Sequence, residues 1–164
     1  MADSPSKTQK LEELARAEFS NLTEAELKLI RGATIGEFAV SDQSTDRADP
    51  SNDPARADSW ANNREIRAKL VQWLCTNQEA IAFIDARGLM VGAAKITGEL
   101  DLSFATVPFP LLMVGCQLTG VANFQYAKLI LLSLYGSVTQ AIAGDRLVAR
   151  ALQLKCGFSA EGEV

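Results

Sequence analysis

The feature that most constrains this chain is a twenty-residue repeat in its C-terminal half. Within each repeat, apolar residues alternate with smaller or more polar ones, which is the period-two pattern of a β-strand. Three segments align at an offset of twenty, and their inward positions form four columns: Leu112, Leu132 and Leu152; Val114, Leu134 and Leu154; Cys116, Gly136 and Cys156; and Leu118, Val138 and Phe158. A strand that recurs at a fixed period indicates stacked repeats.

The length of the repeat favours one architecture. Twenty residues are fewer than the roughly thirty that a strand–helix–strand unit needs. They suit one turn of a parallel β-solenoid, whose strands stack about 4.8 Å apart. We therefore predict a mainly β fold, a β-solenoid of about four coils over residues 84–164. A β-sandwich with coincidental spacing is the alternative.

The residues before the repeat predict helices. Residues 9–32 have the pattern of one or two amphipathic helices. Thr23 and Glu26 stand three apart, as in a capping box, and Gly32 or Gly36 would end the helix that they begin.

The chain divides into four segments by composition. Residues 41–59 contain no large aliphatic or aromatic side chain, so we predict a polar linker there. A capping helix is expected from Ile66, Leu70, Trp73 and Leu74, which recur at helical spacing. The predicted segments are 1–40 (helical), 41–59 (linker), 60–83 (capping helix) and 84–164 (β-solenoid repeats).

Composition excludes several classes of function. The 164 residues include no histidine, which removes the usual protease dyads and most zinc sites. The formal net charge is −4, so no basic excess is present to bind nucleic acid. The sequence has no dinucleotide-binding glycine motif, P-loop or Cys-x-x-Cys motif. We assign no catalytic, cofactor-binding or metal-binding residue, and we expect no cofactor.

Two sets of side chains come nearest to a site. Glu99 and Asp101 would point outward together from a strand, and such a carboxylate pair could serve glycoside hydrolysis. The alternation of outward polar residues along a strand explains the pair more simply. Cys116 and Cys156 share a column two coils apart, about 9–10 Å, which is beyond disulfide reach. They are interpreted as packing residues. Cys75, at a helix end, has no histidine to activate it.

A membrane-spanning helix is not expected, although Lys128 is the only charged residue between Leu102 and Gly144. Prolines, glycines and amides interrupt that stretch, and its longest strongly apolar run is too short to cross a bilayer. Three cysteines fit a reducing compartment, so we expect a cytoplasmic protein. Peripheral membrane contact stays open.

Several motifs resemble a family of bacterial proteins with pentapeptide-repeat-like β-solenoids, often labelled membrane-associated oxidoreductase. The motifs are NREIRAKLVQWLC (63–75), IDARGL (84–89), ITGELDL (96–102), VPFPL (107–111) and GFSAEGEV (157–164). The resemblance implies a right-handed solenoid with an α-helical N-terminal cap region, and this chain looks like a short or truncated member. Only fragments of the strict five-residue motif remain, such as Ala127-Lys128-Leu129.

These expectations point to a protein that binds rather than catalyses. We predict a non-catalytic scaffold or protein-interaction module, with a membrane-associated oxidoreductase, on the family label alone, as the alternative. Because no cap follows Val164, we expect self-association, or contact with another protein, through the C-terminal end of the solenoid. Residues 84–164 carry six acidic and six basic side chains, which argues against mimicry of DNA.

Overall fold

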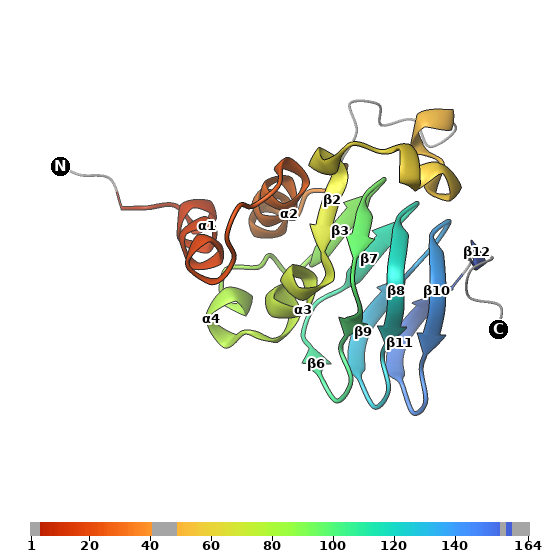
Figure 1. Ribbon diagram of the computed structural model, residues 1–164. Coiled ribbons are helices and arrows are strands. Elements are labelled where there is room, and N and C mark those ends of the chain that lie inside the picture. Colours follow the sequence, from red (N-terminus) through yellow and green to blue (C-terminus); the bar gives the residue numbers. More distant parts are fainter. Residues whose placement is uncertain (1–3, 41–48, 155–156, 159–164) are drawn as a thin grey trace.

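A computed structural model of the chain describes residues 4–40, 49–154 and 157–158. The α-helices gather at one end of a stack of strands (Figure 1). They are α1 (Lys7–Glu18), α2 (Glu24–Ile35), α3 (Ala68–Thr76) and α4 (Gln78–Ile81). Three short 3-10 helices follow β1 in the chain: η1 (Pro50–Asn52), η2 (Pro54–Ser59) and η3 (Asn62–Arg64).

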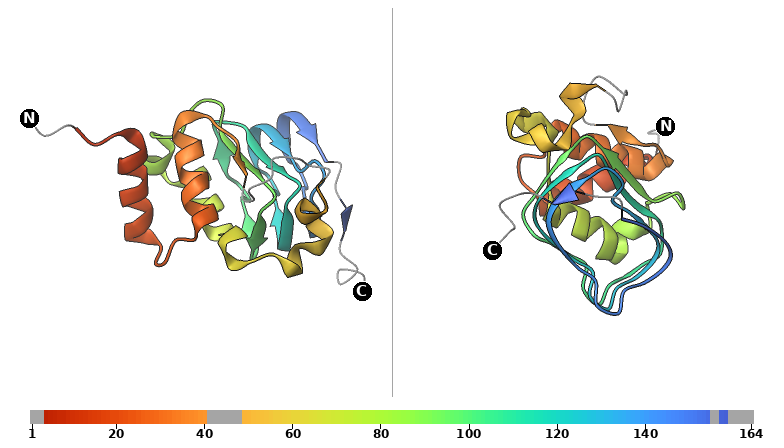
Figure 2. Two further views of the ribbon diagram at one scale, coloured as in Figure 1. Left: turned by 90° about the horizontal axis from the view of Figure 1, so that it is seen from above. Right: turned by 90° about the vertical axis from the view of Figure 1, so that its right-hand side faces the viewer.

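The strands form two parallel sheets. The first has the order β1 (Ala39–Val40), β3 (Leu89–Gly92), β7 (Leu111–Val114), β9 (Lys128–Ser133) and β11 (Val148–Gln153), and β6 (Thr106–Val107) also pairs with β9. The second has the order β2 (Glu65–Arg67), β4 (Lys95–Thr97), β8 (Gln117–Asn123), β10 (Val138–Ala143) and β12 (Gly157–Phe158), and β5 (Leu100–Asp101) also pairs with β8. The chain passes repeatedly from one sheet to the other, so successive layers superpose when viewed end-on (Figure 2).

The predicted fold class is wrong. Among the described residues the structure is mixed α/β, 34% helical and 31% strand, with two parallel sheets, four α-helices and three 3-10 helices, and it is not a mainly β, right-handed β-solenoid with a helical cap. The error arises because the sequence pattern overestimated the share of residues in strands. Helices take as large a share of the chain as strands do, and several strands are only two or three residues long.

The predicted columns also need a correction of register. Leu132 pairs with Leu152, as expected, but its partner on the other side is Leu111, and Leu112 pairs with Ser133. The pairings of Leu89 with Leu111, Leu111 with Leu132 and Leu132 with Leu152 shorten the repeat from 22 to 21 to 20 residues. A one-residue slip exchanges the two faces of a strand. Leu111 is therefore fully buried, whereas Leu112 is only partly buried.

The helix signals near the N-terminus are confirmed. The Thr23 hydroxyl accepts a hydrogen bond from the Glu26 backbone N–H, and the Glu26 carboxylate accepts one from the Thr23 backbone N–H. Gly36 ends α2 at φ 69°, a left-handed conformation that glycine adopts without a steric penalty. The residues around Phe19 separate α1 from α2, so the segment holds two helices.

The capping helix predicted over 60–83 is shorter than expected. Ile66 lies on β2, which pairs with β4, and the helix α3 begins only at Ala68. Leu70 and Leu74 are fully buried on α3, in agreement with the helical spacing. Within 41–59, the described part contains η1 and η2. The division of the chain into segments at these boundaries remains a prediction.

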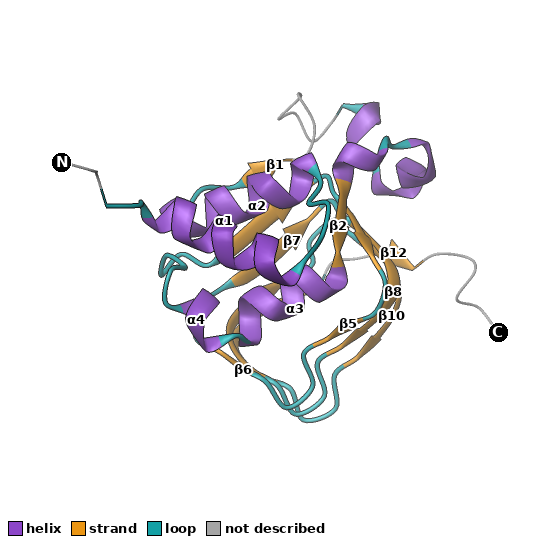
Figure 3. Ribbon diagram, turned by 60° about the vertical axis from the view of Figure 1, so that its left-hand side comes forward, coloured by secondary structure: helices purple, strands orange, loops and turns teal. Residues whose placement is uncertain are grey.

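One hydrophobic core runs from the helices into the space between the sheets. Helices α2 and α3 pack against one end of the strand stack (Figure 3). Leu29 and Leu70 from these helices belong to the same buried cluster as Leu89, Ile96 and Leu111 from the first strand layers. The helices therefore cover one end of the apolar interior.

Burial along the stack predicts a difference between two leucines in the same register. Leu132 is 0% exposed, whereas its neighbour Leu152 is 51% exposed. We expect Leu132→Ala to lower the free energy of unfolding by about 2–5 kcal/mol, the range for a buried leucine. We expect Leu152→Ala to cost less than about 1 kcal/mol, because the side chain is half in water. Urea denaturation of dilute protein measures both, and equal losses would contradict this account of the core.

Candidate functional site

A groove opens where three strands of the first sheet end. Gly92 is the last residue of β3, Val114 is the last residue of β7, and Tyr135 follows β9 by two positions. Ligands commonly bind beyond the carboxyl ends of parallel strands. The groove has a volume of about 680 Å³, which is within the range of small-molecule sites. It is therefore a candidate binding site.

The surface that lines the groove is more apolar than polar. Its described lining is Phe38, Val40, Asp49, Pro50, Asn52, Asp53, Pro54, Arg56, Gly92, Ala93, Val114, Gly115, Tyr135 and Gly136. Asp49 accepts a hydrogen bond from the Ser51 backbone N–H (2.9 Å), and Asp53 accepts one from the Ala55 N–H (3.0 Å). Each carboxylate thus caps a 3-10 helix, which is a structural role.

A buried arginine holds the wall of the groove in place. Arg64 donates from Nε (3.1 Å) and Nη2 (2.9 Å) to the carbonyl oxygen of Ala93. Its Nη1 donates to the Ser51 carbonyl (2.9 Å), and Nη2 also donates to Asn52 Oδ1 (3.1 Å). The guanidinium carbon lies 3.7 Å from the centre of the Trp60 ring. One side chain therefore connects the 3-10 helices to the end of β3.

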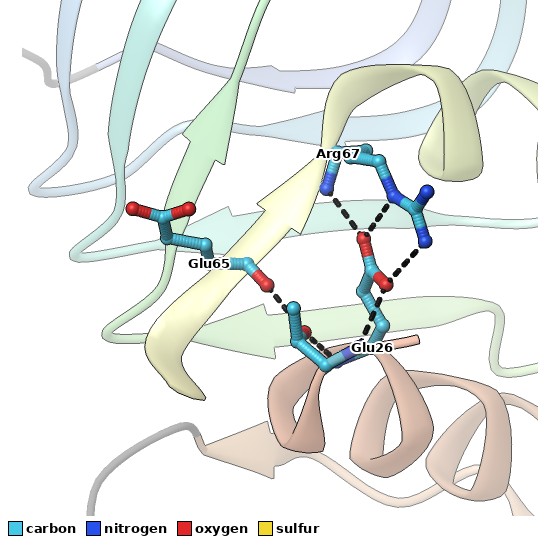
Figure 4. Close-up of polar contacts among 4 residues, drawn as sticks. Glu26, Glu65 and Arg67 are labelled. Carbon is cyan, nitrogen blue, oxygen red and sulfur yellow. Dashed lines mark hydrogen bonds and ion pairs between the residues drawn. The ribbon is translucent and has the colours of Figure 1, made fainter. Parts of the chain in front are cut away.

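A second arginine joins the helices to the second sheet (Figure 4). The carboxylate of Glu26 is fully buried and accepts from the backbone N–H and Nε of Arg67, both at 2.9 Å, and from its Nη2 at 2.9 Å. Thr23, the N-cap of α2, donates its hydroxyl to the Glu65 carbonyl at 2.6 Å. The N-terminus of α2 is thereby fastened to β2, and these residues form a structural junction.

Competing effects act on the pKa of Glu26. Burial by itself raises that pKa, because the charged form loses its hydration. Hydrogen bonds from the Arg67 side chain, from the Arg67 and Thr23 backbone, and the charge of Arg67 together outweigh burial. The pKa of Glu26 therefore lies below its ordinary value, and the carboxylate is ionised at neutral pH.

The described cysteines are packing residues. Burial raises the pKa of the Cys116 thiol to about 12, and burial also raises the pKa of Cys75 well above its ordinary value. Sγ of Cys116 lies 3.6 Å from the Val114 carbonyl oxygen and 3.7 Å from that of Val91. Both thiols are protonated at neutral pH, so neither is a ready nucleophile. Cys156 lies outside the described residues.

The two acidic residues singled out in the sequence are both exposed. Glu99 precedes β5 and Asp101 ends it. Asp101 Oδ1 accepts hydrogen bonds from the backbone N–H (3.0 Å) and hydroxyl (2.6 Å) of Ser103. These bonds lower the pKa of Asp101, which argues against a role as a general acid.

The far end of the strand stack is only partly covered by the residues that the structure describes. The strand β11 is the last in its sheet, and its apolar residues Val148 and Leu152 are 60% and 51% exposed. The positions that pair with Ala149 and Leu152 in the preceding layer, Leu129 and Leu132, are buried. The exposure of Leu152 therefore reflects the absence of a following layer in this sheet among the described residues, whereas Val148 pairs with the exposed Lys128 and lies on the outward face.

Within the described ranges, no cluster of three or more side chains of the types that hold metal ions is present. In the same part of the chain, every helix is too short or too polar to cross a bilayer. Comparison with family models, with curated proteins and with solved structures gave no match. The resemblance inferred from the sequence motifs thus remains a prediction.

Sequence reasoning missed the groove and both arginine contacts. The pairs Asp49-Pro50 and Asp53-Pro54 are a local signal, since aspartate at the N-cap and proline at the next position favour a helix start. The contact of Glu26 with Arg67 has no local signal, because 41 residues separate the two. Only the fold brings them together.

The Glu26 contacts predict a loss of stability that depends on pH. We expect Glu26→Gln to lower the free energy of unfolding by about 2 kcal/mol at pH 7, because charge-assisted hydrogen bonds are lost in a buried site. The pKa is lower in the folded state than the ordinary value of 4.5, so this stabilisation is complete above that value. It disappears as the pH falls through the folded pKa, where the wild type and the variant should converge.

Denaturation from pH 3 to pH 8 measures this effect. The control is Glu24→Gln, because Glu24 is exposed and its partner Lys28 lies 3.5 Å away, and we expect a change below about 0.5 kcal/mol. A pH-independent difference between wild type and Glu26→Gln would contradict an ionised Glu26.

The Arg64 contacts predict local loosening. We expect Arg64→Lys to speed limited proteolysis within residues 50–60, because lysine cannot reproduce the forked hydrogen bonds. The control is Arg56→Lys, since Arg56 is exposed and makes a 4.0 Å ion pair with Asp53. Peptide mapping by mass spectrometry identifies the cleavage sites. Equal cleavage of both variants and the wild type would show that Arg64 does not hold this segment.

Proposed function

We propose that this protein is a non-catalytic protein-interaction module and that it binds other polypeptides at the open end of the strand stack. The observation that supports this most strongly is the contrast between Leu132 and Leu152, which share a register but differ from 0% to 51% in exposure. Apolar side chains that stand half in water beside a buried core form a surface that a partner would cover.

The edge of β11 offers two kinds of contact at once. An edge strand has unpaired backbone N–H and C=O groups that another strand can bind. The side chains of Val148, Leu152 and Leu154 add exposed apolar area beside that edge. We infer that a second copy of the chain is one such partner, in which case each copy would cover the apolar end of the other.

The alternative role as a membrane-associated oxidoreductase gains no specific support. The thiols of Cys75 and Cys116 are buried, and burial favours their protonated form. Neither of these two cysteines takes part in a disulfide, which is consistent with our proposal of a cytoplasmic protein. Peripheral contact with a membrane is a second way to cover the apolar end, and vesicle binding would reveal it.

Self-association tests this proposal directly. We expect light scattering after size-exclusion chromatography to show a mass that rises with concentration for the wild type. Leu152→Glu should shift the protein to the monomer, because it places a charge in the proposed interface. The matched control is Ile130→Glu, an exposed apolar residue (39%) on β9, which should still associate.

Two results would overturn the role of this surface. One is a wild type that remains monomeric at millimolar concentration and also binds no vesicles. The other is equal dissociation by Leu152→Glu and Ile130→Glu. Circular dichroism of both variants checks that each is folded.

A further inference from the structure

Three equivalent turns lie in successive layers at one corner of the strand stack. Each is closed by a hydrogen bond from the backbone N–H of its fourth residue to the carbonyl of its first: Ala105 to Leu102 (3.1 Å), Ala127 to Phe124 (3.0 Å) and Leu147 to Gly144 (3.0 Å). The turns are also bonded to one another, because Phe104 N donates to the Gln125 carbonyl and Tyr126 N donates to the Asp145 carbonyl.

The third residue of each turn has a positive φ: Phe104 at 61°, Tyr126 at 58° and Arg146 at 55°. Turns of this kind normally place glycine or asparagine at that position, because other side chains are strained there. Here the position holds two large aromatic residues and an arginine. Strained residues of this kind are often found at functional sites.

The three side chains form a continuous stack, which we name the corner ladder (Phe104, Tyr126 and Arg146). The rings of Phe104 and Tyr126 are 4.9 Å apart between centres and inclined by only 3°. The guanidinium carbon of Arg146 lies 5.6 Å from the centre of the Tyr126 ring, within the range of cation–π contact. One end of the ladder is thus closed by a cation.

The other end of the ladder is open. Phe104 is 75% exposed, more than Tyr126 at 45%. Its turn joins β5 to β6, and these strands pair only with β8 and β9, so no described strand layer stacks on the outer side of Phe104. A ring face next to a preformed stack is therefore available to a ligand.

We propose that the outer face of Phe104 binds an arginine side chain of a partner protein, with Asp101 as the charged contact. A guanidinium is planar, stacks on aromatic faces and forms hydrogen bonds with carboxylates. Arg146 makes the same kind of contact at the other end of the ladder. This site is separate from the open end at β11 and does not depend on it.

Asp101 supplies the charge that favours a cation over a neutral ring. It is exposed at the end of β5, immediately before the Phe104 turn, and hydrogen bonds from Ser103 hold its Oδ1 in place and lower its pKa. Its Oδ2 accepts no hydrogen bond from any residue in the described ranges. An ionised carboxylate with one free oxygen can therefore pair with a cation that stacks on Phe104.

Titration followed by NMR tests the proposal on the labelled full chain. The probe is N-acetyl-arginine amide, and we expect saturable shifts of the ring signals of Phe104 and Tyr126. Phe104→Gly should abolish the shift of the remaining Tyr126 ring without loss of thermal stability, because glycine relieves the positive φ. Phe104→Tyr should keep the shifts, and Asp101→Asn should weaken binding several-fold.

Three outcomes would overturn the proposal. N-acetyl-norleucine amide could cause equal shifts, which would indicate a nonspecific apolar surface. Methyl β-glucoside could bind where the arginine amide does not, which would indicate a carbohydrate site. Phe104→Gly could unfold the chain while Phe104→Tyr shows no saturable shift with the arginine amide, which would leave the corner ladder a structural element. Because Leu152 lies on β11, Leu152→Glu should not change the titration, so this test and that of self-association fail independently.

Discussion

The parallel register of the strands is the constraint on which the rest of this structure depends. Each layer places a leucine directly on the leucine of the layer before it, so that Leu89, Leu111 and Leu132 form a buried file. No single layer encloses this file, since each strand is short and its apolar face is covered only by neighbouring layers and by the opposite sheet. Stability therefore comes from stacking, and every layer needs a neighbour or a cover on each side.

The two ends of the stack meet this need differently. At one end, α2 and α3 contribute their own leucines to the core, and the buried carboxylate of Glu26 joins α2 to β2 through Arg67. At the other end, the file continues to Leu152, where it meets solvent. The same packing that buries Leu132 in the core thus leaves Leu152 half exposed at the end of the described strands, and this surface is the one that we propose for association.

Side-chain stacking at the corner follows from the same register. Because the layers superpose, residues 22 and then 20 positions apart come to lie side by side, and Phe104, Tyr126 and Arg146 form the corner ladder. The sequence contained a sign of this, since Phe104 and Tyr126 each stand immediately before an alanine that begins a repeated Ala-x-apolar unit. The sequence does not show that these aromatic residues have positive φ angles or that their rings stack, and only the structure supplies both observations.

The sequence by itself determined the local features of this protein: the capping box at Thr23, the end of α2 at Gly36, and the alternation that places Leu132 inside a strand. These follow from interactions within a few residues, which a linear pattern records. Only the tertiary structure decided the mixed α/β class, the pairing of Leu132 with Leu111 in place of Leu112, and the contact of Glu26 with Arg67. The strand register depends on the lengths of the turns between the strands. The fold class and the contact of Glu26 with Arg67 depend on which distant segments share the core, because packing free energy is gained between segments that are far apart in the chain.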